Sequence, residues 1–228
     1  MARTSAIFRG KRIEIIPNCV DPIQFDGKDK AKARAILGLP QDRRLILFGA
    51  LSSAGDRRKG YHLLAPALDY LAHRLPRNSV DVVVMGMDRP EGPPRFPLNA
   101  HYLGVIEDDT RLAAAYAAVD ILVAPSLEDN LPYMVMEAMS CGTPCVAFDC
   151  SGMPDLIENE VTGYLARPYE PEDFARGIEK MVKDEGWRSF LSANARSAVL
   201  AMFSPEVIAR KHLSLYEDLI GSESKTSE

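Results

Sequence analysis

Apolar positions along the chain follow two alternating patterns. Short apolar, β-branched runs are typical of buried strands, whereas apolar residues at three- and four-residue spacing are typical of helices. The runs predict strands at Ile13–Pro17, Leu45–Ala50, Val82–Met85, His101–Leu103, Ile121–Ala124, Pro144–Phe148 and Tyr164–Leu165. The spacing predicts helices at Lys30–Leu37, Tyr61–Leu75, Thr110–Ala118, Pro132–Ser140, Pro171–Lys183, Trp187–Ala201 and Pro205–Ile220. This alternation favours an α/β fold, a doubly wound parallel sheet with helices on both faces.

The pattern fits one domain, because 228 residues suffice for a single substantial α/β core. We assign residues 1–220 to this domain. Residues 221–228 are predicted to form a disordered tail, since they contain no apolar anchor. A strand is predicted almost at the N-terminus, as if the chain were the second half of a longer protein.

Composition and charge argue against several classes of protein. The net charge of -5 leaves no basic surplus for neutralising phosphates, which argues against a nucleic-acid partner. No apolar run approaches the roughly 20 residues that cross a bilayer, and the N-terminus has no apolar signal core, so we expect a cytoplasmic protein. Four unevenly spaced cysteines, Cys19, Cys141, Cys145 and Cys150, are predicted to be buried small residues; a zinc site from the last three is the weaker alternative.

The most informative segment runs from Ala124 to Pro144, where a predicted strand leads through an acidic loop into a helix. Asp129 lies in the loop, Pro132 suits the first helical position, and Glu137 lies one to two turns into the helix. The N-terminus of a helix carries partial positive charge and unpaired N–H groups, which suit a diphosphate. Flanking carboxylates can accept hydrogen bonds from sugar hydroxyls.

This segment resembles the signature of the family 4 glycosyltransferases of the GT-B fold. In that signature two acidic residues stand eight positions apart before an Ala-Met-Ala-Cys-Gly-Thr-Pro-like run, and Asp129 and Glu137 match it, with Asp in place of the usual first Glu. Further matches follow in the expected order at Ile16-Pro17-Asn18, Val20-Asp21, Arg58-Lys59-Gly60, Val84-Met85-Gly86, Leu103-Gly104-Val105, Ser151-Gly152-Met153-Pro154-Asp155 and Thr162-Gly163-Tyr164. The resemblance covers most of residues 13–220.

The resemblance implies that the chain is the C-terminal, Rossmann-like donor-binding domain of a retaining glycosyltransferase, one half of a GT-B architecture whose N-terminal acceptor domain is absent here. The donor would be a nucleotide-diphosphate sugar, with no cofactor. A hexosyl group would pass to a saccharide, lipid or other acceptor, as in polysaccharide biosynthesis. The acceptor would bind through the missing domain, peripheral membrane association of the full-length enzyme stays open, and the isolated domain would be inactive.

The resemblance also implies a metal-independent reaction. The sequence agrees, because Glu107-Asp108-Asp109 is better explained as a helix cap than as a metal-binding Asp-x-Asp motif. We therefore predict no metal ligands in this chain.

Three residues would by resemblance carry the chemistry. Lys59 would approach the donor diphosphate, Asp129 would hold hydroxyls of the transferred sugar, and Glu137 would bind the ribose hydroxyls. Each has a simpler alternative: a solvated lysine, a helix cap and an exposed helix residue respectively. A cation near a helix N-terminus is locally unfavourable, and an anionic ligand would resolve that conflict at Lys59.

Further contacts with the donor are predicted around these three. The resemblance implies a second cation, an arginine a few residues before Lys59, but Gly49-Ala50-Leu51-Ser52-Ser53 offers no clear match, so Arg57 or Arg58 is the candidate. Glu128 is the alternative to the shorter Asp129. Because Pro132 has no N–H to donate, phosphate contacts would fall to Asn130, Leu131 and Tyr133. Gly104 and Val105 would lie beside the base, and Gly152 would line the cleft.

Other functions stay open at this stage. A non-catalytic nucleotide-sugar-binding module is the main alternative, since Asp129 and Pro132 depart from the family pattern. A GT-B-type epimerase would need catalytic carboxylates elsewhere, and a phosphorylase would need a lysine-bound pyridoxal phosphate. A dinucleotide-dependent dehydrogenase is disfavoured, because no G-x-G-x-x-G motif follows the first strand.

Overall fold

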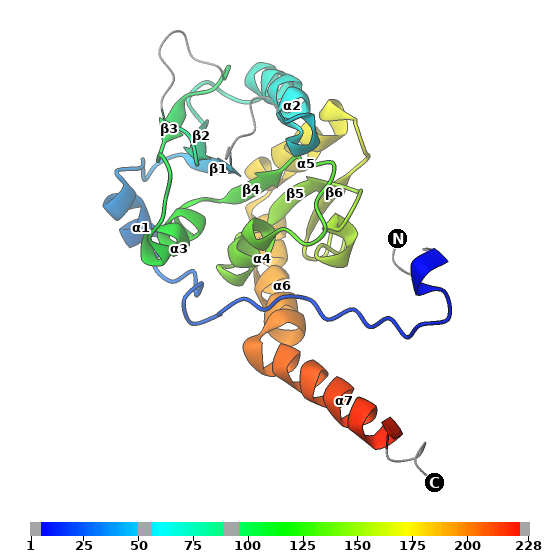
Figure 1. Cartoon of the computed structure of the whole chain (residues 1–228). Coiled ribbons are helices and arrows are strands. Elements are labelled where there is room, and N and C mark those ends of the chain that lie inside the picture. The colour runs from blue at the N-terminus through cyan, green and yellow to red at the C-terminus, as the bar shows by residue number, and fades with distance from the viewer. Residues whose placement is uncertain (1–5, 50–55, 89–95, 224–228) are drawn as a thin grey trace.

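A six-stranded parallel sheet forms the centre of the molecule (Figure 1). The computed structural model describes residues 6–49, 56–88 and 96–223. The strands are β1 (Arg44–Gly49), β2 (Val80–Met85), β3 (Ala100–Tyr102), β4 (Ile121–Ala124), β5 (Cys145–Phe148) and β6 (Gly163–Ala166). Their order is β3-β2-β1-β4-β5-β6, and every neighbouring pair is parallel. The predicted doubly wound α/β sheet is therefore confirmed.

Helices cover both faces of the sheet. The α-helices are α1 (Lys30–Leu37), α2 (Tyr61–Arg74), α3 (Asp109–Ala118), α4 (Tyr133–Ser140), α5 (Pro171–Lys183), α6 (Glu185–Phe203) and α7 (Pro205–Glu223). Short 3-10 turns lie at η2 (Ala6–Phe8), η3 (Arg57–Lys59) and η4 (Met153–Asp155). Alternate strand residues point to opposite faces, so Leu45 and Leu47 pack with α1, α3 and α4, whereas Ile46 and Phe48 pack with α2 and α5.

Side-chain caps fix where several helices begin. Asp108 caps α3 by accepting a hydrogen bond from the Arg111 N–H at 2.7 Å, which confirms the cap predicted at this acidic run. Asp29 and Asp184 cap α1 and α6 in the same way.

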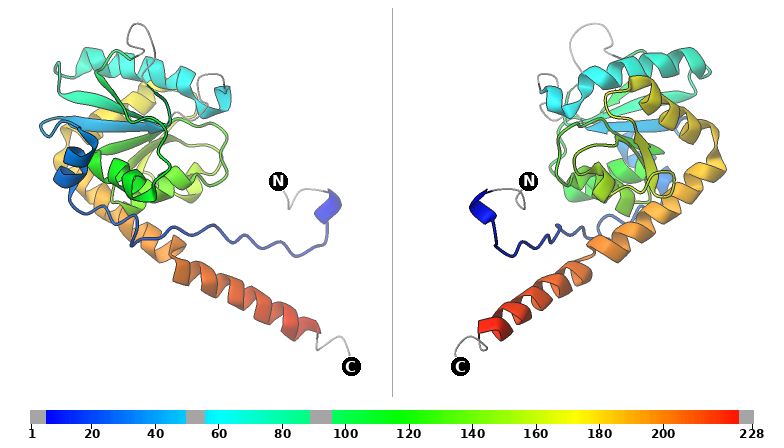
Figure 2. Two further views of the ribbon diagram at one scale, coloured as in Figure 1. Left: turned by 60° about the vertical axis from the view of Figure 1, so that its left-hand side comes forward. Right: turned by 90° about the vertical axis from the view of Figure 1, so that its right-hand side faces the viewer.

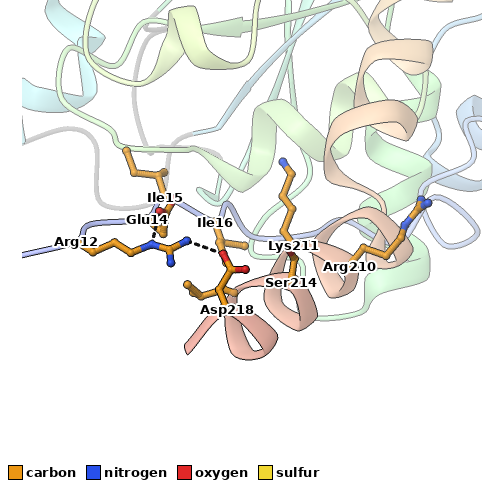
Figure 3. Close-up of a pocket in the computed structure, with 9 residues that line it drawn as sticks. Arg12, Glu14, Ile15, Ile16, Arg210, Lys211, Ser214 and Asp218 are labelled. Carbon is orange, nitrogen blue, oxygen red and sulfur yellow. Dashed lines mark hydrogen bonds and ion pairs between the residues drawn. The ribbon is translucent and has the colours of Figure 1, made fainter. Parts of the chain in front are cut away.

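The strand predicted at Ile13–Pro17 is wrong. This segment has no strand pairing, and its Ile15 is 76% exposed. It runs beside the C-terminal helices instead, where the Arg12 guanidinium donates to Asp218 of α7 at 3.0 Å (Figure 3). The Val20 N–H donates to the Phe203 carbonyl at the end of α6. The neighbours of this apolar run are therefore residues of α7, and it pairs with no strand.

Helix α7 projects from the body of the molecule, in the same general direction as the N-terminal segment (Figure 2). It continues to Glu223, so residues 221–223 are helical where the sequence predicted a tail, and residues 224–228 lie outside the described residues. Leu213, Tyr216 and Ile220 are largely exposed on it. Within the described part of the chain, no helix combines the length and apolar character that a membrane crossing requires.

The strand order reverses between β1 and β4, which lie side by side. The chain leaves β1 toward α2 on one face and leaves β4 toward α4 on the other face. In open α/β sheets the crevice beyond the carboxyl ends of such strands is where ligands bind. A ligand site is therefore expected beyond the carboxyl ends of β1, β2 and β4.

Candidate functional site

A cavity of about 440 Å³ opens at this strand-order reversal. Its wall is formed by the carboxyl ends of β1, β2 and β4, by one side of α3, and by the N-terminus of α4. The polar side chains at its wall include those of Lys59, Ser126 and Asp129, and the remaining lining is mainly apolar. A mostly apolar cavity with a few convergent polar groups is the usual form of a small-molecule site.

The turn that carries Lys59 is fixed against the loop after β4. Asp56 caps η3, and the Leu127 N–H donates to the Arg58 carbonyl at 2.7 Å. Gly60 ends the turn with φ +69°, and a Cβ there would lie 1.8 Å from the carbonyl oxygen of Pro125. Only glycine meets both requirements, so Gly60 allows the Lys59 turn to lie close to the β4 loop.

Lys59 and Asp129 meet at the cavity wall. The Lys59 Nζ lies 3.3 Å from the Asp129 Oδ2, and their side chains are 42% and 25% exposed. Partly exposed pairs of this kind contribute only about 0–1 kcal/mol to stability, so the ammonium can exchange its partner at small cost. Helix α4 is capped at Pro132, so the alternative that Asp129 serves as a helix cap is wrong.

The loop carrying Asp129 is held by the segment after β5. The Asp129 N–H donates to the Ser151 Oγ at 3.0 Å, and the Gly152 N–H donates to the Asp129 carbonyl at 2.8 Å. A Cβ at Gly152 would lie 1.6 Å from the Asn130 carbonyl oxygen. Gly152 therefore allows the loop after β4 and the segment after β5 to lie in close contact. The next residue, Met153, lines the cavity.

Helix α4 points its N-terminus at the cavity. It begins at Tyr133, one residue after the position predicted from Pro132, which acts as the N-cap. Leu131, Tyr133 and Met134 line the cavity, whereas Asn130 is exposed. The first N–H groups of a helix have no acceptor within the helix, so those of Tyr133 and Met134 suit an anionic ligand.

Glu137 lies one turn further along α4, on the same face as Tyr133. It is half-buried, and the hydroxyl of Tyr116 donates to its Oε2 at 2.8 Å. Burial raises the pKa of the Glu137 carboxyl; the Tyr116 hydrogen bond lowers it, and the charge of Asp109 raises it, with a net increase. Glu137 is therefore no ordinary exposed helix residue. It lies outside the cavity lining itself and is linked to it by its hydrogen bond with Tyr116, which lines the cavity.

The loop after β3 closes another side of the cavity. Gly104 adopts φ +68°, and its carbonyl accepts a hydrogen bond from the Gly86 N–H at 2.8 Å. Val105 is 56% exposed, and the following Ile106 lines the cavity. Gly104 therefore shapes the turn that presents Ile106.

Two predicted contacts point elsewhere. The Arg58 guanidinium makes two hydrogen bonds with Asp56, at 3.1 and 2.9 Å, and its side chain is 65% exposed. Glu128 is exposed, near the Arg58 charge. Neither belongs to the cavity lining. In the segment 49–53, which offers no clear match to the second cation of the family, residues 50–53 lie outside the described residues.

Several cavity residues were missed by sequence reasoning. Tyr116 and Leu112 line the cavity from α3, and their four-residue spacing places them on one face of that helix. Met134 packs so closely on β1 that a Cβ at Gly49 would lie 2.4 Å from its sulfur. The helical spacing of Leu112 and Tyr116 could have identified one buried face, but it carried no sign that this face borders a cavity.

The cysteines are not gathered into a metal site. Cys141 and Cys145 are buried as predicted, Cys150 is partly buried, and Cys19 is exposed, which contradicts the prediction for that residue. Across the described ranges, no group of three or more His, Cys, Asp or Glu side chains could hold a metal ion. The zinc alternative for Cys141, Cys145 and Cys150 is thus not supported.

Comparisons with known proteins agree with this fold. The family model described as glycosyl transferases group 1 matches residues 42–184. A D-inositol 3-phosphate glycosyltransferase of Xylanimonas cellulosilytica is 31% identical over 203 residues, which cover 82% of this chain and 47% of that protein. The chain thus spans about half the length of this curated relative.

Solved structures share the fold. Sucrose-phosphate synthase from Thermosynechococcus elongatus superposes with a TM-score of 0.76 at 28% identity, over 94% of this chain and 54% of that one. HepE of Anabaena, crystallised in complex with UDP-glucose, superposes with a TM-score of 0.72 at 24% identity, over 93% of this chain and 60% of that one.

Proposed function

The chain belongs to the group 1 glycosyl transferases, and from this premise we propose that it is the C-terminal, donor-binding domain of a family 4 enzyme with the GT-B fold. The observation that carries the proposal is the convergence of Lys59, Asp129 and the N-terminus of α4 on one cavity, with Glu137 joined to its wall through Tyr116. The partial span of the chain on its relatives supports the assignment to one half of a larger enzyme.

The donor in this proposal is a nucleotide-diphosphate sugar. Its diphosphate lies between the Lys59 ammonium and the first N–H groups of α4, because both favour an anion. Its ribose hydroxyls donate to Glu137, and its base occupies the apolar side of the cavity near Ile106. Asp129 then accepts hydrogen bonds from the transferred sugar. HepE, which shares the fold, was crystallised with UDP-glucose, a ligand of this class.

The proposed reaction transfers a hexosyl group with retention of configuration and without a divalent metal. The bond between the sugar and the diphosphate breaks as the acceptor oxygen bonds to the same face of the sugar, and the acceptor's proton passes to the departing phosphate oxygen. Lys59 and the helix dipole stabilise the charge that develops on that phosphate. The acceptor site belongs to the other half of the enzyme, so the isolated chain should bind the donor without turning it over.

Calorimetric titration of the chain with UDP, GDP and ADP tests the donor site. We expect one nucleoside diphosphate to bind with 1:1 stoichiometry, and Lys59→Met to weaken it about 10- to 100-fold, because a hydrogen bond to a charged group contributes roughly 1.5–3 kcal/mol. Lys28→Met is the matched control, since Lys28 pairs with Asp26 at 2.9 Å and lies outside the cavity lining. The proposal fails if none of the three nucleotides binds, or if the two variants weaken binding equally.

A non-catalytic binding module is the second candidate. The replacement of the usual first Glu by Asp129, which in this structure pairs with Lys59, is the observation that favours it. A sugar-transfer assay on the full-length protein separates the two. Intact nucleotide binding with no transfer to any acceptor would favour the module.

A further inference from the structure

Tyr116 is the largest fully buried side chain among the described residues, 1% exposed, yet it borders the cavity. Its hydroxyl has one proton, and that proton is donated to the Glu137 Oε2 at 2.8 Å. The two residues come from different helices, α3 and α4, so the contact is made only by the folded chain.

The ring of Tyr116 is held from several directions. Its centroid lies 6.1 Å from that of Phe25, with the ring planes tilted by 58°. Its backbone carbonyl accepts a hydrogen bond from the Thr143 Oγ1 at 2.8 Å, and Thr143 is itself buried. A phenol fixed in this way gives its hydrogen bond in one direction only.

This arrangement leaves some hydrogen-bond acceptor sites of the Glu137 carboxylate unoccupied. A carboxylate offers about four acceptor sites on two oxygens, and Tyr116 uses one of them. The other oxygen can still accept from a ligand, and its carboxylate is held in one orientation before any ligand arrives. Preorganised acceptors of this kind discriminate strongly against a ligand that lacks the matching hydroxyl, because the acceptor is then left without a donor.

Building on the proposed function, we propose that Tyr116 is a positioning residue that orients Glu137 toward the ribose, so that the cavity selects ribonucleoside diphosphates over those without ribose hydroxyls. Tyr116 acts through Glu137, and the selectivity belongs to the pair. No other described side chain donates a hydrogen bond to Glu137.

A cycle of protein and ligand changes tests this role. Two ligands are used: whichever of UDP, GDP and ADP binds tightest, and the 2′,3′-dideoxy form of that nucleotide. Each is titrated into the wild type and into Tyr116→Phe, which removes the hydroxyl and keeps the ring. We expect the wild type to prefer the ribonucleotide at least 10-fold, and Tyr116→Phe to lose most of that preference while dideoxynucleotide binding stays within about two-fold. A purely structural role would weaken both ligands alike.

Tyr164→Phe is the matched control. Its hydroxyl donates to Asp173 at 2.9 Å, which is the same kind of bond, and it lies outside the cavity lining. It should keep the full preference. Placing 3-fluorotyrosine at position 116 keeps the hydroxyl and makes it a stronger donor, so the preference should be retained there even if Tyr116→Phe folds poorly.

The possible outcomes distinguish a failure of the proposed donor site from a failure of the role proposed for Tyr116. If no nucleoside diphosphate binds the wild type, the proposed function itself fails. If the wild type prefers the ribonucleotide and Tyr116→Phe retains that preference, or if 3-fluorotyrosine at position 116 abolishes it, the role of Tyr116 is refuted and the donor site stands.

Discussion

The two ends of the central sheet both hold basic and acidic side chains, but with different numbers of partners. At the amino end, Asp120 is 3% exposed and bonds to Arg34 at 2.8 Å and to Lys30 at 3.0 Å, while the Leu45 N–H donates to it at 2.9 Å. Both of its oxygens therefore accept hydrogen bonds. At the carboxyl end, Lys59 and Asp129 share one contact of 3.3 Å beside a cavity.

Residues of the same types thus have different roles at the two ends of the sheet. The guanidinium of Arg34 also donates to four backbone carbonyls, so the Asp120 cluster ties α1 to the sheet. Lys59 and Asp129 are partly exposed and can each change partner. We infer that the amino-end cluster stabilises the fold and the carboxyl-end pair binds the ligand.

The largest expected effect is on stability at the amino end. Asp120→Ala should lower the free energy of unfolding by about 3–5 kcal/mol, because it leaves the buried Arg34 without its carboxylate. Urea unfolding measures this. Asp218→Ala, which removes an exposed pair with Arg12, should change the same quantity by less than about 1 kcal/mol. Equal losses for the two variants would remove the distinction between the clusters.

The next effect is on catalysis at the carboxyl end. In the complete enzyme, Lys59→Met should reduce kcat/KM by a factor that corresponds to about 2–4 kcal/mol, the scale for removing one preorganised group that stabilises the transition state. Steady-state sugar transfer measures it. Turnover within a few-fold of the wild type would contradict the role of Lys59.

A pH dependence should follow from Glu137. Its ionised form accepts hydrogen bonds from the ribose, and burial raises the pKa of this carboxyl above the usual 4.5, as does the charge of Asp109, while Tyr116 lowers it. Nucleotide affinity should therefore fall as the pH drops through that raised pKa, at a higher pH than for an ordinary glutamate. Calorimetry across a pH series should show that Glu137→Gln removes this part of the dependence, while the titration of the phosphates remains. An unchanged profile in Glu137→Gln would exclude Glu137 as its source.

The smallest effect is on stability at the carboxyl end. Asp129→Ala should change the free energy of unfolding by less than about 1 kcal/mol, because its pair with Lys59 is partly exposed. Thermal or urea unfolding measures this. A loss as large as that of Asp120→Ala would show that the pair is structural.

Much of the fold could be predicted from local pattern. The strands beginning at Leu45 and Val82 and the helices at Lys30 and Tyr61 were placed within two residues of their observed starts, because apolar periodicity and capping residues act locally. The segment Ile13–Pro17 was misassigned since an apolar run indicates contact with some surface, and in this protein its neighbour is α7. The identity of that neighbour depends on tertiary structure.

The site was predictable to the extent that its motifs are local. The positions of Lys59 and Asp129 followed from the resemblance, and the structure joins them in one ion pair. The contact between Tyr116 and Glu137 crosses from α3 to α4, and no spacing within either helix encodes it. Arg58 was overvalued because the sequence could not show that Asp56 holds its guanidinium.

A crystal structure of the chain with the nucleoside diphosphate that binds tightest is the most direct test of the central claim. The account predicts the diphosphate within hydrogen-bond distance of the Lys59 Nζ and the N–H groups of Tyr133 or Met134, with the ribose against Glu137. A nucleotide bound in the hollow between residues 12–16 and α7, or anywhere remote from Lys59, would contradict it.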